Sequence, residues 1–454
     1  MQNDILPLLH KYDVPLPRYT SYPTVPYWNS DSFSVPVWLD SVRSLFNDEN
    51  GEICIYIHLP FCEDLCTYCA CNKRITKNHK VETPYLKSVL KEWEMYRSLF
   101  PTRPVIREIH LGGGTPTFFS PQNLLELING ITEGCDIAES HEFSIEVHPN
   151  NTTLEHLKVL RSVGFNRISV GVQDFDPTVQ YIIHRQQSFE QTKRVIDWAR
   201  QLGYESVNVD LIYGLPKQTL ESITSTINYV NLLKPDRIAF YSYAHVPWKS
   251  KGQRRYTDDD VPKADLKLDM YNLGNSLLTA AGFESIGMDH FALPTDKLMI
   301  AFESGKLHRN FMGYTTTNHK LVIGLGASSI SDTWSSFAQN EKSVEEYQLK
   351  VDAGQFPIVN GHHLSELDLI IREHILNLMC NGKTTFKSGM PDEEIKDQAF
   401  EKWKSFEDDD LLIMSGDTIE VTPKGRLFVR NISAVLDQYL QSETRESGLF
   451  SKAI

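Results

Sequence analysis

Six short β-rich runs alternate with longer amphipathic stretches between residues 52 and 245. The runs cover residues 53–59, 106–111, 143–147, 167–172, 207–212 and 237–243. The stretch after the third run places Leu154, Leu157 and Leu160 at three-residue steps, as on one face of a helix. This alternation is typical of repeated βα units around a parallel sheet. The chain is therefore predicted to be an α/β protein.

Six βα units fit either a partial (βα)6 TIM-type barrel or an open doubly wound sheet, and periodicity alone does not separate the two. The motifs described below favour the barrel. A sheet extension or lid is expected over residues 282–334, and the last helix is predicted to begin at Thr422 and Pro423. The string PRYTSYPT (17–24) is expected to be extended rather than helical.

Three parts are predicted along the chain. They are an N-terminal segment covering the active site (1–50), the barrel with its sheet extension (51–360) and a small, mainly helical C-terminal domain (361–454).

Composition excludes several classes of function. The 45 basic and 59 acidic residues leave a net charge of -14, so no overall basic field attracts nucleic acid or anionic lipid. No apolar run approaches the roughly 18 residues of a membrane-spanning helix, and the amino end carries no export signal. We expect a cytoplasmic monomer without a nucleic-acid or membrane partner.

The cysteines carry the strongest chemical signal. Seven cysteines in a chain without an export signal argue against a disulfide framework. Four of them fall in the string CEDLCTYCAC (62–71), which puts Cys62, Cys66 and Cys69 on one loop after the first predicted strand. Three thiolates on a four-iron cluster leave one iron open, whereas structural zinc and simple electron-transfer clusters use four ligands. A zinc site, Cys71 as a fourth ligand, and redox or inert thiols remain alternatives.

Glycines and polar residues follow the other predicted strands. The second strand ends in Gly112–Gly114 and Thr115, where glycine lets the backbone approach a ligand closely. Later strands end near Glu146, Gln173 and Asp210. In barrel enzymes this edge is the active face, so these residues are predicted to meet in one site.

The cysteine string resembles the CxxxCxxC loop of the radical S-adenosylmethionine enzymes. Longer strings are similar to the oxygen-independent coproporphyrinogen III oxidases over nearly the whole chain, among them PRYTSYPT, YIHLPFCEDLCTYCACNK, HLGGGTPT, SIEVHPN, GFNRISVGVQDF and NVDLIYGLPKQT. The resemblance implies a [4Fe-4S] cluster on Cys62, Cys66 and Cys69, and a catalytic role for Cys71. It also implies S-adenosylmethionine contacts, with space for two molecules, at Tyr56, Tyr68, Gly113, Gly114, Thr115, Glu146, Gln173, Arg185, Asp210, Ala244 and Ile330.

The same resemblance implies the reaction and its partners. The substrate would be coproporphyrinogen III, and a 5'-deoxyadenosyl radical would convert two of its propionates to vinyl groups in haem biosynthesis. An electron donor and an electron acceptor, both unidentified, are required. Because the substrate carries four carboxylates, nearby cations are expected to bind it; the candidates are Arg185, Arg309, Lys73 and Arg74.

Two points limit the resemblance. Met312 stands where the family string RNFQGYTT has Gln, so a polar contact in the substrate lid is lost or replaced. Haem chaperones of the same superfamily share the cluster loop without decarboxylating, and they are the alternative function. Those relatives tend to have Phe at the position of Cys71 and lack the PRYTSYPT segment.

Overall fold

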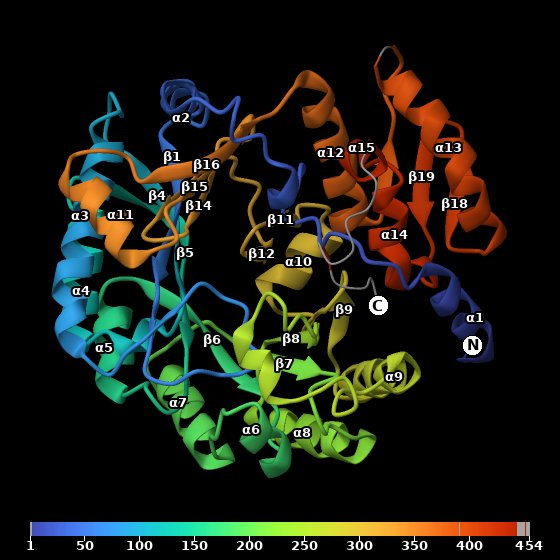
Figure 1. The fold of residues 1–454 in the computed structure, drawn as a ribbon, viewed down its shortest axis with the longest axis horizontal. Helices are drawn as coiled ribbons and strands as arrows, with labels where there is room; N and C mark the ends of the chain where they lie inside the picture. Colours follow the sequence, from blue (N-terminus) through green and yellow to red (C-terminus); the bar gives the residue numbers. More distant parts are fainter. Residues whose placement is uncertain (1, 390, 443–449, 451–454) are drawn as a thin grey trace.

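The computed structural model describes residues 2–389, 391–442 and 450. Six parallel strands form its centre, and each matches a predicted run (Figure 1). They are β1 (Glu52–Leu59), β4 (Val105–Gly113), β5 (Asp136–Val147), β6 (Phe165–Gln173), β7 (Ser206–Tyr213) and β8 (Arg237–Ser242). They lie side by side in chain order. A doubly wound sheet would reverse its order at a switch point, so this order is that of a partial barrel, as predicted.

Helices cover the outside of these strands (Figure 1). They are α3 (Glu82–Arg97), α4 (Pro121–Thr132), α5 (Leu154–Ser162), α6 (Pro177–Ile182), α7 (Phe189–Gln201) and α8 (Leu220–Leu233). Alternate strand residues such as Phe143, Ile145 and Val209 are fully buried in the main apolar core. The residues between them carry polar side chains that line cavities on the opposite face of the strands, as Ser144 and Asp210 do.

The sheet continues beyond both ends of the six strands to a total of 12 strands. The short strands β9 (Glu284–Ile286) and β10 (His290–Ala292) extend it beside β8. On the β1 side, β13 (Val322–Leu325) pairs in parallel with β1 and is followed by antiparallel strands. These are β14 (Ile330–Asp332), β15 (Ser336–Asn340) and β16 (Ile358–His363). The expected sheet extension is thus present, although its pairing with β1 was not predicted.

Shorter elements connect these parts. They include α2 (Val35–Asp48), β2 (Phe61–Cys62), β3 (Arg74–Ile75), η2 (His79–Val81), η3 (Pro116–Phe118), η4 (Lys251–Arg255), α9 (Ala264–Ala280), α10 (Lys297–Glu303), β11 (His308–Asn310), β12 (Gly313–Thr315) and α11 (Val344–Asp352).

The C-terminal region contains helices around a small sheet, to the right of the barrel in Figure 1. Its elements are α12 (Glu366–Asn381), β17 (Lys383–Thr385), α13 (Asp392–Asp408), β18 (Leu412–Ser415), β19 (Thr418–Val421), η5 (Gly425–Phe428), α14 (Val429–Ala434) and α15 (Gln438–Ser442). The predicted helix start at Thr422 is wrong. Thr422 Oγ1 instead accepts from the amide of Gly425 in a turn, and the α-helix begins at Val429.

The N-terminal segment joins this region to the barrel. Helix α1 (Gln2–Tyr12) lies against it, with the Tyr12 ring stacked on Phe406 at 4.7 Å. Residues 17–24 are not helical, as predicted, and α2 follows the short helix η1 (Val25–Tyr27). Arg18 forms an ion pair with Asp289 and lies over the ring of Tyr241. Among the described residues, no helix has both the length and the apolar character that crossing a bilayer requires.

Candidate active site at the carboxyl ends of the strands

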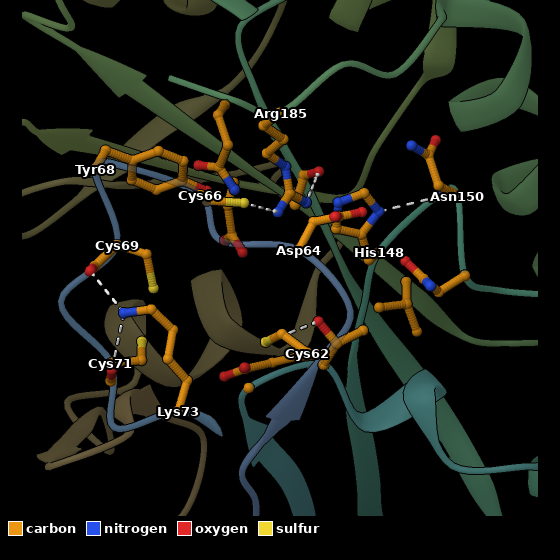
Figure 2. Close-up of a pocket in the computed structure, with 18 of the residues that line it drawn as sticks. Cys62, Asp64, Cys66, Tyr68, Cys69, Cys71, Lys73, His148, Asn150 and Arg185 are labelled. Carbon is orange, nitrogen blue, oxygen red and sulfur yellow. Dashed lines mark hydrogen bonds between the residues drawn. The ribbon is translucent and has the colours of Figure 1, made fainter. Parts of the chain in front are cut away.

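A cavity of about 600 Å³ opens where the parallel strands end (Figure 2). It brings together most of the predicted site residues: Cys62, Cys66, Tyr68, Cys69, Cys71, Gly113, Gly114, Thr115, Glu146, Gln173, Arg185 and Asp210. These residues come from the cysteine loop, from the carboxyl-terminal parts of β4 to β7 and from the turn after α6, which carries Arg185. Their convergence follows from the parallel order of the strands, which places all these ends at one edge.

The cysteine loop is closed at its base and packed against neighbouring elements. Strands β2 and β3 pair in parallel, and the amide of Thr76 donates to the carbonyl of Cys62 at 2.9 Å. The Thr67 amide donates to the Ile183 carbonyl at 2.9 Å and anchors the middle of the loop after α6. The backbone that carries the thiols is therefore fixed by contacts outside the loop.

Two side chains donate to the sulfurs. Thr115 Oγ1 lies 3.3 Å from Cys62 Sγ, and Arg185 Nη1 lies 3.7 Å from Cys66 Sγ. Burial raises the pKa of Cys62 to about 11. A hydrogen bond with Cys71 lowers the pKa of Cys69 to about 6, and the same contact raises the pKa of Cys71. The Thr115 donor opposes the rise at Cys62, because a donor aimed at sulfur favours the thiolate, which is the form that binds iron.

This donor set fits a cluster. Three cysteines within one loop face a common cavity (Figure 2), and each thiolate of a cluster binds a different iron atom. Among the described residues, no three His, Cys, Asp or Glu side chains converge on a point that would hold one metal ion. A cluster does not need that convergence.

The glycines after β4 are required by close approaches of the chain. Gly113 has φ of +113°, and a Cβ there would lie 2.7 Å from the ring of His58. A Cβ on Gly114 would lie 2.6 Å from the backbone of Pro60. The glycine turn therefore passes directly behind the start of the cysteine loop, where a larger residue would push the loop away.

Two carboxylates face the cavity in different surroundings. Glu146 accepts from the Gly113 amide and lies 3.3 Å from His110 Nε2. Asp210 accepts from Ser169 at 3.0 Å and from Asn208 at 2.7 Å, and burial raises its pKa to about 6. A cationic ligand in the cavity would favour the ionised form of Asp210.

Gln173 and Arg185 form another part of the wall. Gln173 adopts φ of +68° and is buried. Arg185 Nη2 donates to the Gly171 carbonyl at 2.7 Å. Burial opposes its charge, but the neighbouring Tyr68 and Cys66 keep the pKa of Arg185 above its usual value.

Three predicted contacts do not line this cavity: Tyr56, Ala244 and Ile330. The Tyr56 hydroxyl lies 3.0 Å from His58 Nδ1, and the other ring nitrogen of His58 lies 2.9 Å from the carbonyl of Asn72. Tyr56 therefore connects β1 to the end of the cysteine loop. Ala244 lines a neighbouring cavity of about 390 Å³, and Ile330 begins β14.

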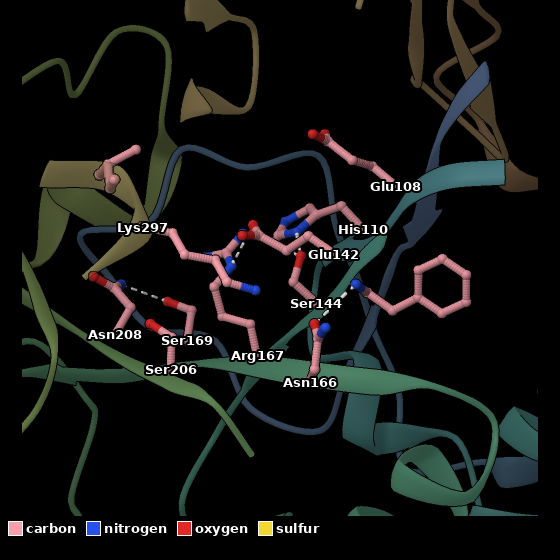
Figure 3. A network of polar contacts seen from close by, with 12 residues as sticks. Glu108, His110, Glu142, Ser144, Asn166, Arg167, Ser169, Ser206, Asn208 and Lys297 are labelled. Carbon is pink, nitrogen blue, oxygen red and sulfur yellow. Dashed lines mark hydrogen bonds and ion pairs between the residues drawn. The ribbon is translucent and has the colours of Figure 1, made fainter. Parts of the chain in front are cut away.

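The interior of the barrel holds a polar network that reaches this site (Figure 3). Arg167 pairs with Glu142 at 2.8 Å and donates to Ser144 at 3.1 Å. Ser144 contacts His110 at 2.7 Å, which leads to Glu146 in the cavity. Met312 lines a smaller cavity of about 100 Å³ inside the barrel.

Sequence reasoning missed His148, which also lines the active-site cavity. Burial lowers its pKa to about 2, so it is neutral there. Its position two residues after Glu146, directly after the end of β5, was a usable signal. Of the predicted carboxylate-binding cations, Lys73 lines the cavity but donates to the carbonyls of the cysteine loop. Arg74 instead pairs with Glu345 at 2.9 Å, outside the cavity.

Comparison with known proteins identifies the family. The Radical SAM superfamily model matches residues 56–230. The oxygen-independent coproporphyrinogen III oxidase of Pseudomonas aeruginosa is 39% identical, covering 98% of both chains. The chain belongs to the oxygen-independent coproporphyrinogen III oxidases. The Escherichia coli protein of that name is 38% identical, covering 97% of this chain and 96% of its own.

A solved structure of the Escherichia coli coproporphyrinogen III oxidase, described as a radical SAM enzyme, confirms the fold. It is 37% identical with a TM-score of 0.88, covering 93% of this chain and 98% of its own. As a member of the radical SAM coproporphyrinogen III oxidases, the chain has a [4Fe-4S] cluster and S-adenosylmethionine as its cofactors.

Proposed function

We propose that this chain catalyses the oxygen-independent oxidative decarboxylation of coproporphyrinogen III to protoporphyrinogen IX, a step of haem biosynthesis. The observation that carries the proposal is near-full-length similarity, at 38–39% identity, to enzymes named for this oxidation. The cavity at the strand ends supports it, because it combines the three cysteines with a glycine turn and carboxylates. The enzyme is a radical SAM oxidoreductase.

When bound, the cofactors would supply radical chemistry able to remove hydrogen from a substrate propionate. The protein holds and orients these groups. Cys62, Cys66 and Cys69 are the cluster ligands in this proposal. Cys71 is the catalytic cysteine beside them, and its place in the same cavity supports that position.

The remaining site residues are proposed to contact S-adenosylmethionine, with space for two molecules. They are Tyr56, Tyr68, Gly113, Gly114, Thr115, Glu146, Gln173, Arg185, Asp210, Ala244 and Ile330. Support comes from the position of most of these residues around one cavity, with Ala244 in the adjoining one.

Arg309 is the strongest candidate to bind a carboxylate of the substrate. It is only 4% exposed, and its Nε and Nη1 have no hydrogen-bond partner within the described part of the chain. Its guanidinium stacks over Tyr314 at 4.5 Å. A buried arginine with unused donors favours an anionic ligand, because an unpaired buried donor is costly.

The N-terminal segment is proposed to cover the site, with the barrel at 51–360 and the C-terminal domain at 361–454. Support comes from Arg18, which lies over Tyr241, a residue of the active-site cavity. We further propose a cytoplasmic monomer that binds neither nucleic acid nor membrane and exchanges electrons with a donor and an acceptor. The net charge of -14 supports the absence of nucleic-acid binding.

One experiment separates this activity from haem binding without decarboxylation. The protein is reconstituted with iron and sulfide without oxygen, then incubated with dithionite, S-adenosylmethionine and coproporphyrinogen III. Chromatography should reveal vinyl products together with 5'-deoxyadenosine. An intact cluster with no vinyl product would favour the chaperone alternative.

A further inference from the structure

The segment that follows β8 folds onto the cysteine loop. Gln253 Nε2 donates to the carbonyl of Tyr68 at 3.1 Å, and Ser250 Oγ donates to the carbonyl of Cys69 at 3.3 Å. Both donors belong to the turn that contains η4 (Lys251–Arg255). This turn therefore contacts the stretch of backbone that carries Cys69.

The turn packs closely against the cysteine loop, and hydrogen bonds within the turn hold its shape. A Cβ on Gly252 would lie 3.0 Å from the carbonyl oxygen of Thr67, so the two backbones meet directly. The Gln253 side chain is 1% exposed, and its Oε1 accepts from the amide of Val246 at 2.6 Å. The turn is thus held in one position on the cysteine loop.

The outer side of this turn is basic. Lys249, Lys251, Arg254 and Arg255 are all exposed, and we call these four residues the basic patch. No acidic residue occurs between positions 245 and 257. The chain as a whole has a net charge of -14, whereas the seven residues 249–255 contain four cations, so their local charge is positive.

Three carboxylates near the basic patch in the chain or on the cysteine loop have other partners. Asp258 lies 3.4 Å from His245 Nε2, and Asp260 pairs with Lys217 at 2.7 Å. On the cysteine loop, Asp64 lies 3.8 Å from the ammonium of Lys77. These three carboxylates thus have cationic or imidazole partners outside the basic patch.

Exposed aromatic side chains adjoin the basic patch. The guanidinium of Arg255 lies 5.4 Å above the ring of Tyr181, which is 62% exposed. Trp248, directly before the patch, is 60% exposed. Tyr, Trp and Arg are the residues most enriched at the energetic centres of protein interfaces.

We propose that the basic patch docks a small acidic electron-transfer protein, which reduces the cluster through the cysteine loop. The inference rests on the proposed function, because radical generation requires an electron at the cluster. One electron leaves the reduced cofactor of the donor and enters the oxidised cluster, and no bond forms between the proteins. Opposite charges speed such encounters, and small interfaces are typical of redox partners.

The test uses the reconstituted holoenzyme and flavodoxin hydroquinone, a small acidic flavoprotein, as the donor probe. The variant Lys251→Glu/Arg254→Glu reverses two charges of the basic patch. A matched control, Lys87→Glu/Lys306→Glu, makes the same charge change at exposed lysines on α3 and after α10. Iron content and the visible absorption spectrum check that each variant keeps its cluster. If the Lys251→Glu/Arg254→Glu variant loses its cluster, the variant Lys251→Gln/Arg254→Gln is used in its place.

Two readouts are measured at low and high salt: flavodoxin binding, and flavin oxidation in a stopped-flow instrument. The patch variant should slow association about tenfold at low salt, with a smaller effect at high salt, and the control variant should resemble the unmodified enzyme. Turnover driven by dithionite, which needs no docking, should be unchanged in both.

Several results would overturn the inference. Equal slowing in the patch and control variants would show only an effect of net charge. A raised requirement for coproporphyrinogen III under dithionite would assign the basic patch to the substrate instead. Unmodified enzyme that makes no product with dithionite would contradict the proposed function, while leaving the salt-dependent binding measurement to judge the docking surface separately.

Discussion

Glu142 Oε1 lies 2.8 Å from Arg167 Nε inside the barrel, and both side chains are 18% exposed. Burial disfavours the charge of Glu142, but Arg167 and Arg237 outweigh it and hold the pKa of Glu142 at about 2. The pair therefore belongs to the stabilising interactions of the barrel rather than to its chemistry.

Glu142→Gln should destabilise the fold by about 3 kcal/mol, because it removes the charge partner of Arg167 and the negative charge beside the buried Arg237. Because the pKa of Glu142 is lowered in the folded protein, the pair stabilises the fold more at neutral pH than at acidic pH. The stabilisation is complete above the ordinary pKa of 4.5 and is lost as the pH falls toward about 2. Urea unfolding at several pH values should show the difference between variant and unmodified protein shrinking over this range.

The control is Glu155→Gln on α5, where the carboxylate lies 4.0 Å from Lys158 at an exposed position. That change should lower the free energy of unfolding by less than about 0.5 kcal/mol. Equal costs for the two substitutions would contradict the structural role of the Glu142 pair.

Gly113→Ala should disturb the cysteine loop as well as the glycine turn. The new Cβ would meet His58, whose Nε2 lies 2.9 Å from the carbonyl of Asn72. We expect weaker S-adenosylmethionine binding and lower iron content after reconstitution. Gly282→Ala is a matched control, because Gly282 also has a positive φ, of +93°, but has nothing within 4 Å of its added Cβ.

In the control variant, backbone strain should lower the free energy of unfolding by only about 1–2 kcal/mol. The control should keep its iron. Iron analysis, equilibrium dialysis with S-adenosylmethionine and denaturant unfolding measure the three quantities. If both variants bind the cofactor equally, the close approach at Gly113 has no role in the site.

Alanine at Cys62, Cys66 or Cys69 should abolish cluster binding, because each thiolate is assigned to one iron. Cys71→Ala should leave iron bound while turnover falls. The buried Cys135, which hydrogen-bonds to the carbonyl of Ile131, provides a control whose loss should affect neither. Iron content, visible absorption and product formation are measured on the same samples. Full activity in Cys71→Ala would show that its role is misassigned.

The sequence predicted those parts of the fold that depend on local patterns. The six parallel strands are recognisable because apolar residues such as Ile145 and Val209 recur at every second position. The pairing of Val322 with Cys54 was not predictable, since the strand is four residues long and its partner lies far away in the chain. Short strands carry little periodicity, and their pairing is set by tertiary packing.

The same distinction holds for the candidate site. The spacing of Cys62, Cys66 and Cys69 was visible because all three lie on one loop. The contact of Gln253 with that loop was not, because it joins residues 185 positions apart through a single side-chain bond. Its burial follows from how the segment after β8 folds back, which no local pattern encodes.

Arg309→Ala should raise the KM for coproporphyrinogen III without changing cluster content or S-adenosylmethionine affinity. The reason is that Arg309 Nε and Nη1 have no hydrogen-bond partner among the described residues, while the substrate brings four carboxylates. Its charge also helps to lower the pKa of buried Asp289, so removing it affects the fold as well. Arg309→Lys keeps the charge but loses the planar fork of donors, and should therefore raise KM with a smaller loss of stability. Steady-state kinetics and thermal unfolding of both variants separate the two effects. An unchanged KM in a folded Arg309→Ala enzyme would exclude a substrate contact, and the unused donors would then need another explanation within the protein.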